Sequence, residues 1–147
     1  MTPDERKGLF RRLNDEMFNH GRTELCDEVY AENASFHDPS FPVEGVAGVK
    51  QQALDLRQAN PDLHINVHDV LCDGDLTAAR WTCAGTARNE FRGLPATGKT
   101  WVMSGMTISK WEGDRIVEEW TNYDTLGTLQ QVGIIPEMAQ QQQQRTT

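Results

Sequence analysis

The feature that most constrains the fold is a change in hydrophobic period near residue 60. In the segment 3–20, apolar side chains such as Leu9, Leu13 and Met17 recur at helical spacing. In the segment 64–72, apolar and polar side chains instead alternate, which is typical of a strand with one solvated face. Helices followed by antiparallel strands indicate an α+β fold, in which the helices pack on one face of a curved sheet.

The same patterns place the individual elements. Turn signals at Asp73-Gly74-Asp75 and Glu112-Gly113-Asp114 separate the later strands, and Asp124 is expected to cap the last helix. We expect one domain over residues 1–136, and a disordered tail over 137–147, which carries five consecutive glutamines. The expected helices are 3–20, 23–30, 48–59 and 125–132, and the expected strands are 34–39, 64–72, 76–89, 100–111 and 115–123.

Composition excludes several classes of partner. The 147 residues fit one domain, and 14 Lys and Arg against 22 Asp and Glu give a formal charge of −8. Nucleic-acid binding needs clustered cations, and so does attraction to anionic membrane, so we expect neither partner. No apolar run approaches the ~20 residues of a membrane span. The three cysteines form no disulfide or CxxC pattern, and reduced thiols favour a cytoplasmic protein.

The histidines do not predict a metal site. His64 and His68 lie four residues apart on an expected strand, which separates them by about 13 Å. No HxH motif or paired carboxylate accompanies them. The sequence also lacks the GK[ST] ending of a phosphate-binding loop and a serine nucleophile elbow.

Three separated segments carry a family resemblance. They are FHDP (36–39), GTARNEFRGLPATGK (85–99) and GDRIVEEWTNYDTLGTLQQVGIIP (113–136). The same order and similar spacing occur in SnoaL-like polyketide cyclases of the nuclear-transport-factor-2-like superfamily. The resemblance extends over about residues 5–136.

The resemblance implies a cone-shaped, curved antiparallel sheet wrapped over N-terminal helices, with an enclosed apolar pocket for a small hydrophobic molecule. Relatives close a ring in polyketide esters by an intramolecular aldol condensation. They use acid/base catalysis, and neither a metal nor another cofactor is implied. They usually associate through the outer sheet face, so a homodimer or homotetramer is expected.

Two positions depart from the family pattern. The alignment puts Thr121 where the cyclases carry their acid/base Asp, and Ala87 where many relatives carry His. A threonine hydroxyl is too weak an acid to replace a carboxyl group. Glu119 lies two residues earlier on the same strand face, so it is the first catalytic candidate. The alternative is that Glu119 is a solvated or paired carboxylate at the rim.

Asp38 is the second catalytic candidate. His37 and Asp38 are adjacent and point to opposite faces, so only one of them is expected to line the cavity. The resemblance favours Asp38, which would accept a proton or orient a ligand hydroxyl. The alternative is that Asp38 caps the turn at Pro39-Ser40.

The remaining candidates are substrate-binding residues on the strands. Gly105 and Thr107 are small and are expected to widen the cavity, while the Tyr123 phenol would lie at its opening. Arg80, Glu118 and Trp120 fall on the opposite, outer face. The full substrate-binding set is His37, Trp81, Met103, Gly105, Thr107, Thr121 and Tyr123.

Three functions remain open from the sequence. The first is a cyclase or isomerase that acts on a hydrophobic carbonyl or polyketide substrate. The second is a hydrolase similar to the superfamily's epoxide hydrolases, which requires Asp38, Glu119 and Arg80 to converge on a water molecule. The third is a non-catalytic binding protein, favoured by Thr121 and Ala87 at the positions of the usual proton carriers.

Overall fold

The computed structural model describes residues 1–137, and residues 138–147, which hold most of the expected glutamine-rich tail, lie outside the described residues. One sheet has the strand order β1-β5-β4-β3-β2. Its strands are β1 (Tyr30–His37), β2 (His64–Asp73), β3 (Leu76–Thr86), β4 (Thr100–Glu112) and β5 (Arg115–Tyr123). The helices are α1 (Pro3–Asn14), the π-helical turn η1 (Asp15–Asn19), α2 (Leu25–Val29), α3 (Gly45–Ala59) and α4 (Thr125–Gln131). None of these helices is both long and apolar enough to cross a membrane.

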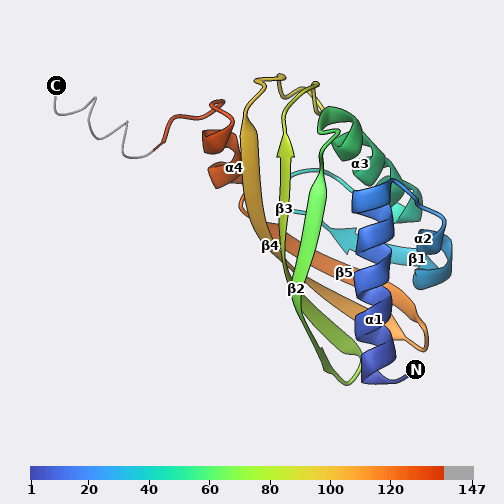
Figure 1. Cartoon of the computed structure of the whole chain (residues 1–147). Coiled ribbons are helices and arrows are strands. Elements are labelled where there is room, and N and C mark those ends of the chain that lie inside the picture. The colour runs from blue at the N-terminus through green and yellow to red at the C-terminus, as the bar shows by residue number, and fades with distance from the viewer. Residues whose placement is uncertain (138–147) are drawn as a thin grey trace.

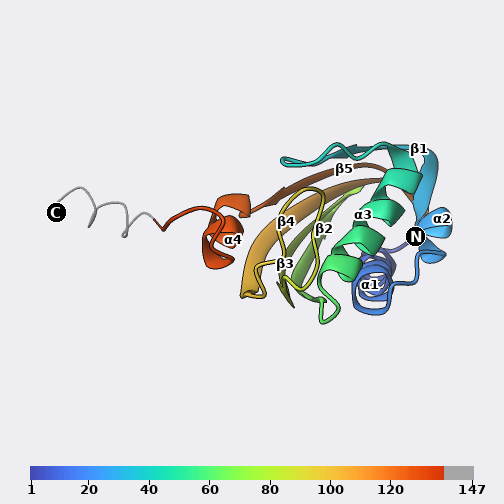
Figure 2. The same cartoon turned by 90° about the horizontal axis from the view of Figure 1, so that it is seen from above.

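The sheet is strongly curved; in the view of Figure 1, α1, α2 and α3 lie to the right of the strands and α4 lies to the left. Seen from above, α1 and α3 lie on one side of the curved strands, and α4 lies beside the far end of β4 (Figure 2). This arrangement confirms the α+β class and the helices packed against a curved sheet. It leaves a hollow between α3, α4 and the concave face of the strands, which is lined by their side chains.

The sheet is antiparallel, as expected, except at one edge. β1 pairs with β5 in the parallel direction, with Phe36 opposite Glu119 and His37 opposite Trp120. The other neighbouring strands are antiparallel, as expected for hairpins with short turns. A parallel pair needs a long crossover, and here α3 and three further strands separate β1 from β5 in the chain.

Several predicted element boundaries also differ from the structure: β1 is Tyr30–His37 rather than 34–39, and α3 begins at Gly45 rather than at residue 48. Tyr30 was expected in the second helix, but it begins β1 and pairs with Ile116, and its buried ring contributes to the core. The third strand ends at Thr86 rather than at residue 89. The Asp62 carboxylate accepts hydrogen bonds from the Thr86 amide at 2.8 Å and the Thr86 hydroxyl at 2.7 Å. These tertiary contacts turn the chain away from the sheet.

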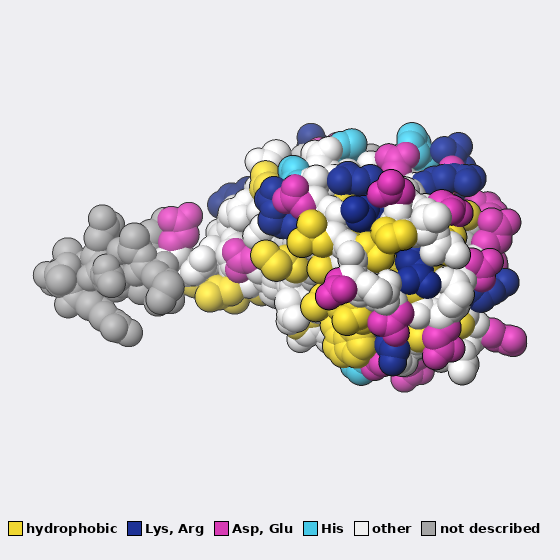
Figure 3. Space-filling model, turned by 90° about the horizontal axis from the view of Figure 1, so that it is seen from below, with side chains coloured by type: hydrophobic (Ala, Val, Ile, Leu, Met, Phe, Trp, Pro, Cys, Tyr) yellow, Lys and Arg dark blue, Asp and Glu magenta, His cyan; other side chains and the backbone are white. Residues whose placement is uncertain are grey.

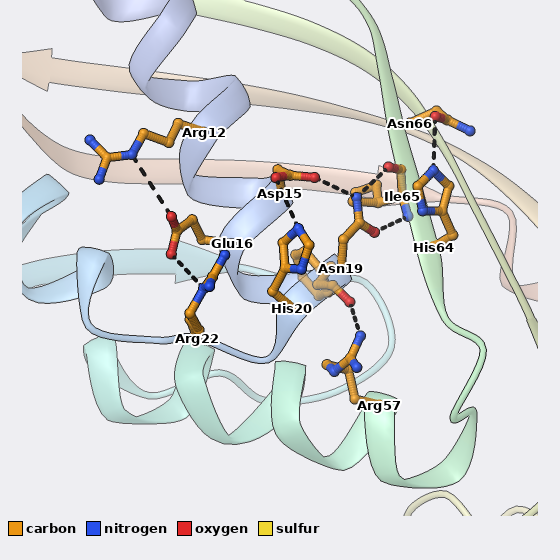
Figure 4. Close-up of polar contacts among 11 residues, drawn as sticks. Arg12, Asp15, Glu16, Asn19, His20, Arg22, Arg57, His64, Ile65 and Asn66 are labelled. Atoms are coloured by element: carbon orange, nitrogen blue, oxygen red, sulfur yellow. Dashed lines mark hydrogen bonds and ion pairs between the residues drawn. The ribbon is translucent and has the colours of Figure 1, made fainter.

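The expected single helix over 3–20 is α1 followed by the π-helical turn η1. The turn places Asn19 against the edge strand β2, as Figure 4 shows. The Asn19 side-chain carbonyl accepts from the Ile65 amide at 2.7 Å, and its NH₂ group donates to the Ile65 carbonyl at 3.1 Å. One amide side chain therefore satisfies part of an open sheet edge, which would otherwise expose unpaired backbone groups.

Arg6 ties α1 to the narrow end of the cone. Its guanidinium donates to the carbonyl of Gly74, in the β2–β3 turn, at 2.8 Å and to that of Gly113, in the β4–β5 turn, at 3.0 Å. The same group lies 5.8 Å from the centre of the Trp111 ring. The core at this end includes the buried side chains of Leu13, Trp111 and Ile116, which do not line the cavity. The narrow end is thus solid, and the open space lies toward α4.

α4 closes the wide end and begins at the expected cap. The Asp124 carboxylate accepts from the Gly127 amide at 2.9 Å. Farther along α4, the Gln131 side chain bonds both backbone groups of Val102, at 2.7 and 2.8 Å. Gln131 therefore continues the sheet at a point where β4 has no strand partner on that side.

Replacement of Asp124 by Ala is expected to destabilise the protein by about 1 kcal/mol, because the Gly127 amide loses its acceptor. The melting temperature should fall by about 2–4 °C, a shift that circular dichroism resolves. Asp124→Asn is the matched control and should melt close to the wild type, since Asn also caps helices well. Equal melting of Asp124→Ala and the wild type would contradict the assigned cap.

Candidate functional site

A cavity of about 210 Å³ occupies the wide half of the cone. Its floor is the inner face of β3, β4 and β5, and its walls come from α1, α3, α4 and the loops at the mouth. The lining is mainly apolar and aromatic, which is typical of a site for a small hydrophobic molecule. Large apolar members of the lining are Phe10, Met17, Phe36, Phe41, Trp81, Phe91, Trp101, Met103 and Leu129.

Three cross-strand pairs of β4 and β5 place most polar groups on the cavity floor. Ser109 lies opposite Glu119, Thr107 opposite Thr121, and Gly105 opposite Tyr123. Because side chains alternate along a strand, all six positions face the same side of the sheet. The pairs follow one another from the closed end of the cone toward its mouth.

Glu119 is a buried carboxylate with two protein donors. Its side chain is only 7 % exposed and borders the cavity. One carboxylate oxygen accepts from the Tyr30 hydroxyl at 2.9 Å, and the other accepts from the Ser109 hydroxyl at 2.7 Å. The structure therefore places Glu119 inside the cone rather than at a solvated rim, held between β1, β4 and β5.

The surroundings of Glu119 favour proton exchange near neutral pH. Burial raises the pKa of Glu119 from 4.5 to about 7, although the hydrogen bonds from Ser109 and Tyr30 oppose this rise. Burial and the neighbouring Glu119 charge also raise the pKa of Tyr30, so its phenol stays protonated and remains a donor. A carboxyl group with a pKa near the working pH suits general acid/base catalysis.

The middle of the floor carries a short chain of hydrogen bonds. The Trp81 indole N–H donates to the Thr107 hydroxyl at 3.0 Å, and the Thr107 and Thr121 hydroxyl oxygens lie 3.2 Å apart. The expectation that Gly105 widens the cavity is not met. A Cβ atom on Gly105 would lie 2.3 Å from the Trp81 ring, so the indole fills the space that the glycine leaves. Gly105 thus positions Trp81 and is covered by it.

Asp38 takes the structural role that the sequence left open, the cap of the turn after β1. One of its carboxylate oxygens accepts from the backbone amides of Ser40 at 2.9 Å and Phe41 at 3.0 Å, which caps the turn. The same oxygen accepts from the Tyr123 hydroxyl at 2.7 Å, and the other accepts from the Gln52 amide at 3.0 Å. Asp38 therefore borders the cavity with both oxygens engaged, and it orients the Tyr123 phenol at the mouth.

The remaining candidates separate between the two faces. His37 borders the cavity at the end of β1, but its imidazole stacks on Trp120 at 5.5 Å and lies 2.7 Å from the Glu118 carboxylate. Its ring is thus engaged on the outer side of the sheet rather than aimed at Glu119. Arg80 pairs with Asp69 at 2.9 Å, also on the outer side. Met103 lines the cavity, as expected.

The structure adds site residues that the sequence analysis did not select. Tyr30 was assigned to a helix, and only its pairing with β5 shows that it reaches Glu119. Ser109 shares the strand face of Thr107, so its alternation was a usable signal. Phe41 and Phe91 meet edge to face at 5.3 Å across the mouth, from loops whose approach no local pattern predicts.

The titratable side chains of residues 1–137 form no cluster of three or more His, Cys, Asp or Glu that could hold a metal ion. His64 and His68 each bond a different neighbour, Asn66 at 3.1 Å and Thr82 at 2.8 Å. All three cysteines are free. The polar lining of the cavity includes the carboxylates and hydroxyls described above together with the side-chain amides of Asn14, Gln52, Asn60 and Asn89.

Comparison with known proteins assigns the family. The family model for SnoaL-like polyketide cyclase matches residues 8–132. The chain belongs to this family. A crystallised protein of Acidithiobacillus ferrooxidans, assigned as a polyketide cyclase, is 32 % identical over 87 % of this chain and 94 % of its own, with a TM-score of 0.77.

Two Streptomyces proteins extend the comparison. IdmH of Streptomyces antibioticus, also assigned as a polyketide cyclase, is 29 % identical, with a TM-score of 0.73, over 90 % of this chain and 99 % of its own. TsrD of Streptomyces laurentii is 21 % identical over 92 % of this chain and 99 % of its own, with a TM-score of 0.83. At this identity the likeness shows the shared fold alone. No curated protein matches the chain in sequence.

The buried position of Glu119 predicts a pH-dependent stability. The folded-state pKa of about 7 lies above the ordinary value of 4.5. The contribution of Glu119 is therefore fully present below about pH 4.5 and is lost as the pH rises through about 7. Relative to Glu119→Gln, the wild type should lose about 2–4 kcal/mol between pH 4.5 and pH 8. Urea unfolding of both proteins across this range measures the difference, and parallel pH curves would contradict the shift.

Proposed function

We propose that the protein is a cofactor-free cyclase or isomerase that acts on a polyketide or a related hydrophobic carbonyl compound, with Glu119 as its proton carrier. The single observation that supports this most is a carboxylate buried against an apolar cavity and held by two donors. The family membership supports the substrate class. Position 121, where family relatives carry the acid/base Asp, is Thr, so the proton carrier has moved two residues along β5.

The proposed reaction uses one carboxyl group in both directions. Ionised Glu119 removes a proton from the carbon next to a substrate carbonyl, which leaves an enolate delocalised into the substrate. The enolate carbon then forms a bond to a second carbonyl carbon of the same molecule, whose C=O π pair moves onto oxygen. Glu119 returns its proton to that oxygen, so the enzyme is restored and no atom is gained or lost. Tyr30 and Ser109 hold the carboxylate in place throughout.

Asp38 has a different proposed role from Glu119. Its oxygens already accept four hydrogen bonds, from two backbone amides, Gln52 and Tyr123. It therefore serves as a positioning residue, which holds the turn after β1 and directs the Tyr123 phenol to the mouth. Trp81, Met103 and Thr107 would contact the substrate along the floor.

The hydrolase alternative is weakened by the position of one side chain. That reaction needs Arg80 beside Asp38 and Glu119, whereas Arg80 bonds Asp69 on the outer face of β2 and β3. The non-catalytic alternative keeps the same cavity and differs only in turnover. It is therefore an outcome of the experiment below.

The test is turnover of a panel of aromatic polyketide methyl esters by the wild type, Glu119→Gln and Glu118→Gln. Glu119→Gln removes the proton carrier and should lower kcat/KM by about 10²–10⁴-fold. Glu118→Gln is the matched control, because Glu118 lies next to Glu119 on β5 but faces His37 outside the cavity. In the wild type, kcat/KM should rise with pH through about 7, as Glu119 ionises.

Two results would contradict the proposal. One is equal activity of the wild type and Glu119→Gln. The other is a rise in melting temperature on ligand binding while no compound of the panel is converted to product. That result would favour the non-catalytic binding protein. Lipophilic epoxides in the same panel report on the hydrolase.

We also propose that the outer sheet face joins two copies of the chain. A row of cross-strand neighbours, Leu71, Ala78, Ile108 and Trp120, crosses four strands on this face. Leu71 is 69 % exposed and Ile108 is 44 % exposed, with Met106 beside the row at 62 %. Figure 3 shows hydrophobic side chains open to solvent among charged ones on one side of the molecule. Such an exposed apolar surface is typical of an interaction site.

Ile108→Glu should convert a dimer into a monomer, because a charge at the centre of an apolar interface loses its hydration without gaining a partner. Sedimentation velocity measures the change in mass. Leu126→Glu is the matched control, since Leu126 is 51 % exposed on α4, away from the row. A monomeric wild type, or an Ile108→Glu protein that remains dimeric, would contradict the proposed interface.

A further inference from the structure

Trp81, Thr107 and Thr121 together carry one more polar hydrogen than the hydrogen bonds among them use. Trp81 N–H and the two hydroxyl groups supply three hydrogens, whereas the contacts among them form only two hydrogen bonds. Within residues 1–137, neither threonine hydroxyl makes any other hydrogen bond. One hydroxyl hydrogen therefore remains available to an acceptor that the protein does not provide.

The burial of the two threonines indicates which hydroxyl holds this hydrogen. Both threonines line the cavity, but Thr107 is only 7 % exposed and already accepts from Trp81, whereas Thr121 is less buried. Either hydroxyl could donate in the Thr107–Thr121 contact. Donation by the less exposed Thr107 avoids leaving a buried hydrogen without an acceptor. Thr121 then directs its own hydrogen into the cavity. The Trp81 indole, seated over Gly105, orients the whole chain of bonds.

We infer that the Thr121 hydroxyl is a specificity-determining donor that binds a carbonyl oxygen of the ligand. An apolar ligand without an acceptor would leave this hydrogen unpaired, so the site selects for a carbonyl within a hydrophobic skeleton. Position 121 thus recognises the oxygen, while position 119 carries the proton.

The distance between Thr121 and Glu119 is consistent with one residue binding the carbonyl and the other transferring the proton. Thr121 and Glu119 are two residues apart on one strand face, a separation of about 7 Å. A carbonyl bound at Thr121 would direct its neighbouring carbon along the floor toward Glu119. The inference therefore rests on the proposed function and adds the group that orients its substrate.

The test compares the binding of 9-fluorenone, a flat tricyclic ketone, with that of fluorene, which lacks the oxygen. Quenching of tryptophan fluorescence measures both affinities, because Trp81 and Trp101 line the cavity. The wild type should prefer the ketone by about threefold to tenfold, the value of one neutral hydrogen bond. Infrared difference spectra should show the bound C=O band at a lower frequency than in an apolar solvent.

The variants separate the hydroxyl from the shape of the cavity. Thr121→Val keeps the side-chain volume and should reduce the ketone preference to about one and abolish the band shift, whereas Thr121→Ser keeps the hydroxyl and should retain both. Ser104→Ala is the matched control, because it removes a hydroxyl from the exposed face of β4. Circular dichroism establishes that each variant is folded.

The outcomes distinguish this inference from the proposed function. Glu119→Gln should keep the ketone preference even though it loses turnover, so a protein that binds the ketone without reacting would still support the role of Thr121. An equal affinity of the wild type for fluorenone and fluorene would overturn the inference. A ketone preference that survives in Thr121→Val would overturn it as well.

Discussion

The register between β4 and β5 is the constraint on which the rest of the site depends. It sets Ser109 opposite Glu119, Thr107 opposite Thr121 and Gly105 opposite Tyr123, all on the concave face. A shift of β5 by one residue would move Glu119, Thr121 and Tyr123 to the outer surface. The same register aligns Ile108 with Trp120 on that surface. One pairing thus supplies both the polar floor of the cavity and the apolar row proposed to join two copies.

The polar groups differ in what surrounds them, and this difference separates their roles. Glu119 lies deep in the cone with only two donors, so burial raises its pKa to about 7. Asp38 lies at the mouth, where two backbone amides and two side chains donate to it. Thr121 lies between them, beside Thr107. The two carboxylates that the sequence placed together as acid/base candidates therefore have unlike environments.

Much of the fold was predictable because it depends on local periodicity. The α+β class, the β2–β3 and β4–β5 turns, and the Asp124 cap follow from alternation, from the turn signals at 73–75 and 112–114, and from helix-capping preferences. The parallel pairing of β1 was not predictable in this way, since it depends on where a long crossover returns. The same pairing brings Tyr30 to Glu119, which explains why Tyr30 was missed.

The sequence by itself determined the kinds of groups available: a carboxylate at 119, a threonine at 121 and an apolar cavity lining. Only the tertiary structure decided what those groups can do. Burial of Glu119 arises from residues far apart in the chain, and the space left by Gly105 is filled by Trp81 from the neighbouring strand. The pKa of Glu119 depends on its exclusion from solvent, and the availability of a hydroxyl hydrogen depends on contacts between strands. Neither property can be read from one segment of the chain.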